Sequence, residues 1–327
     1  MGLVYNNFRV FLGARRQGAS FASVLTLGRQ QVYLLRGEVR QLALEFPEFL
    51  IDPSQSPQPG EYCEPWLKAW LGCQTVEAID ASDYEGATLV HDMNLPIPAE
   101  WEAQFSVVID GGSIEHIFFA TIAMANAMRL TSVGGWLFVA SVANNHCGHG
   151  FYQFSPEWFF RTLTRDNGFE LGEVLLMPHA YPGAELSINK RLYRVTDPAQ
   201  CRSRVGLVNA EPVLILVSAQ RIADCELFRR PPQQSDYLQK WLATPASELT
   251  ATNSQQSPRR ILRRVARGVW RRLLMGLPRQ WNQHLEGRKQ RRAYCLSNRR
   301  VYEPWVPRPA AVGGSHAERA VPRDSRP

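Results

Sequence analysis

Three aspartates stand at the ends of short apolar runs, where a carboxylate could bind a polar ligand. Asp80, Asp92 and Asp110 each close a run of mainly aliphatic residues that predicts a buried strand. A carboxylate offers two acceptor oxygens at the spacing of a diol, so the acid after the second strand could bind both ribose hydroxyls of an adenosine. The acid after the third strand could accept from an exocyclic amine. Each aspartate alone could equally form a turn or cap a helix, but that alternative explains the three together less well.

Three histidines lie near the next part of the same pattern. His146 and His149 follow the fifth predicted strand, and His116 lies near the start of the helix before it. Histidine is the side chain that most readily takes up a proton near neutral pH, and loop histidines at a strand end favour contact with a substrate. His116 could equally be a buried partner of a backbone carbonyl. The short spacing of His146, Cys147 and His149 lacks a distant fourth ligand, so we predict no metal site.

These residues need a particular set of elements to bring them together. Residues 106–109 predict a buried strand, residues 115–130 a helix with apolar positions at helical spacing, and residues 136–142 a second strand. Such a unit forms a right-handed crossover in a parallel sheet, and ligands of these sheets bind at the carboxyl ends of the strands. Asp110 and His146 are then expected at the same edge.

The rest of the chain supplies further strands and helices. Residues 1–21 are expected to be irregular apart from a short helix at Arg15 and Arg16. The alternation of the remaining elements predicts an α/β fold with seven strands. Five further strands are expected over residues 23–28, 75–80, 88–91, 169–177 and 212–218, and three further helices over residues 31–44, 62–71 and 156–166.

At the strand-end positions the sequence resembles class I S-adenosylmethionine-dependent methyltransferases, over roughly residues 20–220. The resemblance implies a Rossmann-like, mostly parallel seven-stranded sheet with helices on both faces and an antiparallel seventh strand. It also implies S-adenosylmethionine as the cofactor. The residues that match the family's cofactor-binding segments are Leu27, Gly28, Arg29, Gln30, Asp80, Asp92, Met93, Asp110 and Gly111.

The first motif departs from the pattern of that family. The family's motif runs Asp-x-Gly-x-Gly-x-Gly, whereas the run from Thr26 to Val32 keeps one glycine, Gly28, and has no acid. Gln30 and Val32 would fill part of the space that glycine leaves for close approach of the cofactor. Either glutamine side chains bind the cofactor instead, or the cofactor is not bound.

Residues 144–157 resemble a segment of methyltransferase-like proteins from bacterial carbohydrate-assembly clusters. We therefore expect an S-adenosylmethionine-dependent methyltransferase that acts on a small polar acceptor, for which a sugar hydroxyl is a candidate. His146, His149 or His116 would act as the catalytic base. The alternative is a non-catalytic methyltransferase-like scaffold or binding protein, in one version peripheral to a membrane. A nicotinamide oxidoreductase is disfavoured because the G-x-G-x-x-G motif is missing.

Basic and acidic residues are distributed unevenly along the chain. Residues 255–327 hold 18 Lys and Arg against 4 Asp and Glu, whereas residues 1–254 hold 19 against 26. We expect a methyltransferase-like domain over residues 1–220, followed by three smaller segments. These are a linker with a short helix over residues 221–257, a basic amphipathic helical tail over 258–306, and disorder over 307–327.

The basic helix, strongest over residues 258–277, suggests partners for the tail. It could dock on the acidic surface of the core, bind an anionic membrane surface or grip nucleic acid, and the last is disfavoured because no base-reading module accompanies the charge. The chain has no apolar run of about 18–20 residues and no signal-peptide pattern at its start. We therefore expect a cytoplasmic protein, with peripheral membrane association through residues 258–277 as a further option.

Overall fold

The computed structural model describes residues 2–58, 60–181, 183–187, 191–238, 287–288 and 291–309. The basic amphipathic helix expected over residues 258–277 lies outside the described residues. So does most of the disordered segment expected at the C-terminal end, from residue 310 onward.

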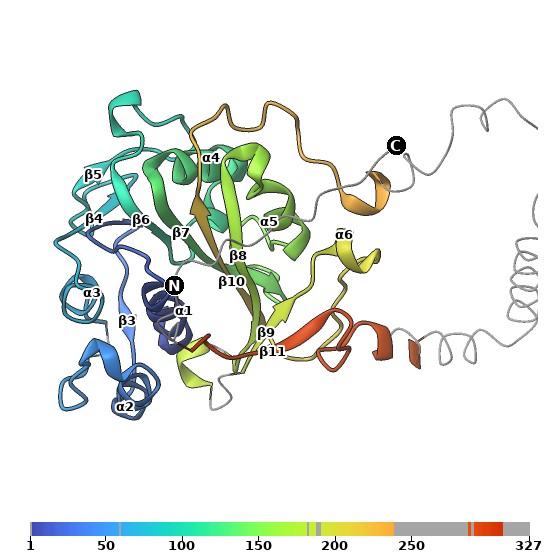
Figure 1. Cartoon of the computed structure of the whole chain (residues 1–327), viewed down its shortest axis with the longest axis horizontal. Coiled ribbons are helices and arrows are strands. Elements are labelled where there is room, and N and C mark those ends of the chain that lie inside the picture. Colours follow the sequence, from blue (N-terminus) through green and yellow to red (C-terminus); the bar gives the residue numbers. More distant parts are fainter. Residues whose placement is uncertain are drawn as a thin grey trace, which may run out of the picture.

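One nine-stranded sheet organises the molecule (Figure 1). From one edge to the other its strands are β5 (Leu89–Val90), β4 (Thr75–Asp80), β2 (Ser23–Leu27), β6 (Phe105–Asp110), β7 (Thr131–Asn144), β10 (Val213–Arg221), β8 (Phe169–Pro178), β9 (Leu192–Val195) and β11 (Tyr302–Trp305). The strands from β5 to β7 are parallel, and β10 runs antiparallel to both of its neighbours. The seven expected strands and the antiparallel seventh are thus confirmed, and β9 and β11 extend the sheet.

Helices cover both faces of the sheet, as expected. They are α1 (Tyr5–Arg16), α2 (Arg36–Glu45), α3 (Glu64–Leu71), α4 (Ala120–Leu130), α5 (Pro156–Thr162) and the short α6 (Pro198–Cys201). Successive side chains of a strand point to opposite faces, so Val107 and Ile109 of β6 join the core under α1, α2 and α3. Val108 joins the core under α4 and α5. Burial on both faces explains why β6 reads as a continuous apolar run.

The N-terminal segment corrects two expectations. Residues 1–21 are not irregular, because α1 is a twelve-residue helix whose Phe8 and Phe11 pack edge-on against Trp70 and Phe138. The helix expected over residues 31–44 begins only at Arg36. The residues before it form β3 (Val32–Tyr33), which pairs in parallel with β1 (Leu3–Val4) in a separate two-stranded sheet.

The C-terminal part corrects the expected domain boundary. Residues 302–305, within the helical tail expected over 258–306, form β11, which pairs antiparallel with β9 (Figure 1). Tyr302 is fully buried, and its hydroxyl donates to the carbonyl oxygen of Gly206 at 2.8 Å. The end of the expected tail is therefore an edge strand of the main sheet.

Within the described part of the chain, we find no helix whose length and apolar content would allow it to span a lipid bilayer.

Candidate functional site

The turn after β2 brings three strand ends together, as the sequence predicted. Gly28 has a φ of +66°, a conformation that favours glycine, and its N–H donates to the carbonyl oxygen of Ile79 at 2.8 Å. A Cβ at Gly28 would lie 3.2 Å from Ser113 Oγ and 3.7 Å from Asp80 Oδ2. The ends of β2 and β4 and the turn after β6 therefore meet at this glycine.

Gln30 fills the space beside that turn. Its side chain is buried, with Nε2 donating to the carbonyl oxygens of Leu27 at 2.6 Å and Gly28 at 3.3 Å. It lies against Gly111, where any Cβ would overlap the Gln30 carboxamide. Gln30 Oε1 is buried without a hydrogen-bond partner among the described residues. The side chain thus occupies the volume that a glycine at this motif position would leave open.

Arg29 and Asp80 differ in their relation to the turn. The Arg29 guanidinium contacts residues outside the turn. Its Nε forms an ion pair with Glu64 at 2.6 Å, and its centre lies 3.8 Å above the ring of Tyr62. Asp80 is half-buried, and its Oδ1 accepts from the N–H of Ala81 at 2.6 Å. Asp80 Oδ2 points toward the Gly28 turn, where it could accept a hydrogen bond from a ligand.

Asp92 and Met93 follow β5, whose end lies beside Asp80, since the N–H of His91 donates to the carbonyl oxygen of Asp80 at 2.8 Å. Asp92 is exposed, and its Oδ1 accepts from the backbone and side chain of Asn94, which lowers the pKa of Asp92. Met93 is buried in the core under α4. The structure therefore gives Asp92 the turn-forming role and Met93 a packing role.

Asp110 is buried and forms the turn after β6. Its Oδ1 accepts from the N–H groups of Ser113 at 2.8 Å and Gly112 at 3.3 Å, while Oδ2 is buried without a hydrogen-bond partner among the described residues. Burial raises the pKa of Asp110, and the nearby carboxylate of Glu115 raises it further. The turn it holds also directs the Ser113 hydroxyl to donate to the Leu27 carbonyl at 2.7 Å.

His146 and His149 line a cavity of about 300 Å³ at the carboxyl ends of the strands, together with Gly111 and His179. His179 Nδ1 lies 2.7 Å from the carbonyl oxygen of Ala180, so this nitrogen carries the proton. His179 Nε2 then accepts from His146 Nε2 at 3.0 Å, which leaves the lone pair of His146 on Nδ1. Burial and the neighbouring His179 and His149 lower the pKa of His146 to about 4, so its ring is neutral at pH 7.

A second group of side chains lies beside this cavity. Glu115 is fully buried, with Oε2 accepting from the Ser141 hydroxyl at 2.8 Å and Oε1 lying 3.9 Å from His149 Nε2. The rings of His116 and His149 are 5.0 Å apart. Burial raises the pKa of Glu115 and lowers the pKa of His116 and of His149. The three predicted histidines thus gather at one place, with His116 on the side away from His179.

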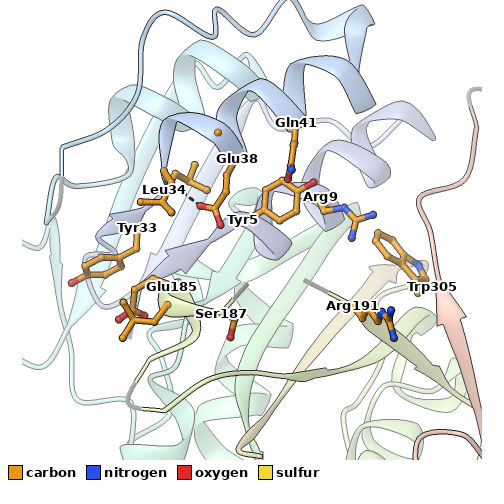
Figure 2. A pocket seen from close by; sticks show the side chains of 13 residues that line it. Tyr5, Arg9, Tyr33, Leu34, Glu38, Gln41, Glu185, Ser187, Arg191 and Trp305 are labelled. Atoms are coloured by element: carbon orange, nitrogen blue, oxygen red, sulfur yellow. Dashed lines mark hydrogen bonds between the residues drawn. The ribbon is translucent and has the colours of Figure 1, made fainter. Parts of the chain in front are cut away.

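A larger groove adjoins the histidine-lined cavity. Its volume is about 920 Å³, and it shares Tyr33 and Glu185 with the smaller cavity. Figure 2 shows these two residues at one end of the groove and Arg9, Arg191 and Trp305 at the other. Neither these two cavities nor the one of about 480 Å³ beside Arg29 and Tyr62 is lined by Gly28, Asp80 or Asp92.

Sequence reasoning missed two members of the site. His179 directly follows β8, whose carboxyl end lies at the same edge of the sheet as that of β7, so a histidine at this position was a usable signal. Glu115 stands in a short 3-10 helix, Ile114–His116, between β6 and α4. Its full burial is not visible in the sequence, since an acid in a connection usually faces solvent.

The chain is similar to solved structures of methyltransferases at low sequence identity. No family model and no curated protein sequence matches the chain. Among solved structures, it is similar to a candidate methyltransferase from Bacillus halodurans, with 13% identity, a TM-score of 0.35, and coverage of 65% of this chain and 99% of that chain. A SAM-dependent methyltransferase from Aquifex aeolicus gives 12% identity, a TM-score of 0.30, and coverage of 65% and 96%.

Structural similarity at this level does not establish an activity. The fold follows from the order and direction of the strands. Five parallel strands in the order β5-β4-β2-β6-β7, followed by the antiparallel β10 inserted before β8, form the arrangement that the sequence resemblance implied. The chain has a Rossmann-like α/β fold, and its strand order is the one that the resemblance to class I S-adenosylmethionine-dependent methyltransferases implies.

Proposed function

We propose that the protein transfers a methyl group from S-adenosylmethionine to a small polar acceptor bound in the histidine-lined cavity. The observation that carries this proposal is the position of Gly111. It packs against Gln30 at the turn after β2, and it also lines the cavity that holds His146 and His149. A methyl donor bound at the turn and an acceptor in the cavity would be neighbours, as in-line transfer requires.

The residues at the turn fit the adenosine half of this cofactor. Gly28 allows close approach of a ligand to the backbone, and the Asp80 carboxylate beside it could accept from ribose hydroxyls. The methionine half fits only when the Gln30 carboxamide turns away from Gly111. That rotation would break two hydrogen bonds to carbonyl oxygens, each worth about 0.5–1.5 kcal/mol. The bound cofactor would supply an electrophilic methyl group.

The histidine pair supplies a base for the acceptor. Because His179 accepts from His146 Nε2, the free lone pair of His146 is on Nδ1, and the ring is neutral at pH 7. A neutral imidazole can take the proton of an acceptor hydroxyl as the methyl group is transferred. His149 and His116, which lie next in the row of rings, are the other candidates for this role.

The adjoining groove favours a sugar as the acceptor class. Aromatic rings of Tyr5, Tyr33 and Trp305 line it together with polar groups of Glu38 and Gln41 (Figure 2). Aromatic faces beside a few placed polar groups suit the apolar faces and hydroxyls of a sugar ring. A sugar in the groove could direct one hydroxyl past Tyr33 toward His146.

Calorimetry with S-adenosylmethionine and S-adenosylhomocysteine tests the proposal on the wild-type chain and on Gln30→Gly. We expect both ligands to bind, and the variant to bind more tightly because the side chain that must move is gone. Asp80→Asn should weaken binding in either background. An absence of binding heat in the wild type and in Gln30→Gly alike would exclude the enzymatic function.

The second candidate is a non-catalytic scaffold with the same fold. Gln30 is the specific observation in its favour, since its side chain fills the cofactor turn in a well-bonded conformation. If this function holds, neither ligand binds the wild type, and the histidine-lined cavity serves binding alone.

A further inference from the structure

We propose that Glu115, His116 and His149 form a binding site for a divalent transition-metal ion of the zinc type. A ligand atom from each of these residues lies within 4.8 Å of the others. The site stands beside the histidine-lined cavity and uses neither the Gly28 turn nor Asp80. It is therefore independent of whether the cofactor binds.

The two buried ligand atoms lie close to the separation that a shared zinc ion would impose. Glu115 Oε1 lies 3.9 Å from His149 Nε2, which is too long for a hydrogen bond. Two ligand atoms of a tetrahedral zinc ion, each bound at about 2.0–2.2 Å, stand about 3.4 Å apart, so a shift of about 0.5 Å would bring these two atoms to that separation. Rotation of the exposed His116 ring can bring the third ligand in, because its side chain is free of close packing on the solvent side.

Within the described chain, neither atom makes a hydrogen bond that would explain its burial. Glu115 Oε1 and His149 Nε2 are inaccessible to solvent, and neither makes a hydrogen bond to another described residue. Leaving a buried polar atom unsatisfied is costly, about 1–3 kcal/mol and more for a charged group. A cation between the two would satisfy both and would balance the charge of a fully buried carboxylate.

The surrounding chain holds the ligands in place. Ser141 donates to the other carboxylate oxygen, Glu115 Oε2, at 2.8 Å, so the orientation of the carboxylate is fixed. The main-chain carbonyl of Glu115 accepts from the N–H of Phe151 at 2.8 Å, which ties the segment carrying His149 to the segment carrying Glu115 and His116. A Cβ at Gly150 would lie only 2.8 Å from that carbonyl, so glycine permits this approach.

The ligand set indicates the class of ion. Two imidazoles and one carboxylate suit zinc and its neighbours in the first transition row, whereas magnesium and calcium prefer oxygen ligands alone. Three protein ligands leave a coordination position open, and His149 lines the cavity of about 300 Å³. The open position would therefore face a molecule bound in that cavity.

Metal binding to the full-length chain tests the site directly. After removal of metals by chelator and dialysis, we expect calorimetry with zinc chloride to give one equivalent bound, and cobalt(II) to give visible absorption bands of a low-coordinate site. Glu115→Gln, His116→Ala and His149→Ala should each weaken zinc binding at least tenfold, and zinc should raise the melting temperature of the wild type but not of His149→Ala.

Matched controls remove the other ligands nearby. Cys147→Ser and His179→Ala delete an adjacent thiol and a cavity histidine that are outside the set, and both should keep wild-type zinc affinity. His116 is exposed, so His116→Ala keeps the test open if a change at buried Glu115 prevents folding. No zinc binding by the wild type, or binding that survives His116→Ala and His149→Ala, would overturn the proposal.

Discussion

Gln30 packs directly on Gly111, joining the turn after β2 to the turn after β6. Its Nε2 donates to the Leu27 carbonyl, and a Cβ on residue 111 would overlap its carboxamide. This single side chain therefore fills the space between the carboxyl ends of these two strands.

The contact between these residues can be measured by a double-mutant cycle. Gly111→Ala should destabilise the fold by about 1–3 kcal/mol, because the added methyl group overpacks a filled site. In a Gln30→Ala background the same substitution should cost much less. Urea unfolding of the two single variants and the double variant gives the coupling energy. Additive changes in the free energy of unfolding would mean that residues 30 and 111 are not in contact.

The lowered pKa of His146 should make the fold less stable in acid. Its pKa is lowered to about 4 in the folded chain, against about 6.5 when unfolded. Between these values the unfolded chain binds more protons, so the free energy of unfolding falls as the pH drops from about 6.5 to 4. Thermal melts at pH 7 and pH 5, in chelator, should show a smaller loss for His146→Gln than for the wild type. An equal loss in both proteins would contradict the lowered pKa.

Asp110 should act in the opposite direction. Burial and Glu115 raise its folded pKa above the ordinary value of 3.8, so the folded chain holds a proton that the unfolded chain releases. Stability from this group is present at low pH and is lost as the pH rises toward the folded pKa. Asp110→Asn removes the ionisation and keeps the shape. We expect its melting temperature, relative to that of the wild type, to be higher at pH 8 than at pH 5, and a constant difference would argue that Asp110 is ionised in the fold.

Tyr302 tests whether the C-terminal strand belongs to the domain. It is fully buried in β11, so Tyr302→Ala should lower the free energy of unfolding by about 3–5 kcal/mol, as other large aromatic truncations do. Tyr302→Phe removes only the hydrogen bond to Gly206 and should cost about 0.5–1.5 kcal/mol. Unfolding followed by intrinsic fluorescence measures both. A negligible effect of Tyr302→Ala would mean that residues 302–305 do not contribute to the stability of the domain.

The parallel part of the sheet could be predicted because its strands carry their own signal. β2, β6 and β7 are buried on both faces and read as apolar runs that end in glycine or a polar residue. Helix α1 could not, because Asn6 and Asn7 are buried along with its apolar residues, so no polar face marks its period. β11 could not be predicted because it follows an arginine-rich stretch, and because its pairing partner is more than a hundred residues away in the sequence.

The site was predictable only in part. Strand order alone brings Gly28 and Asp80 together and gathers His116, His146 and His149, so the sequence sufficed for these. Asp92 also forms a local turn with Asn94, and this turn competes with ligand binding for the same oxygen. The roles of Glu115 and Gln30 depend on burial and side-chain direction, which no spacing encodes.

The pairing of β11 with β9 also changes what the basic segment is. Since the chain returns to the same sheet at residues 302–305, residues 239–286 are an insertion anchored on both sides, and a partner that they bind would stay within reach of the domain. A protease cut within the insertion would then produce two fragments that remain associated, so the two pieces should co-elute in gel filtration and separate only in denaturant.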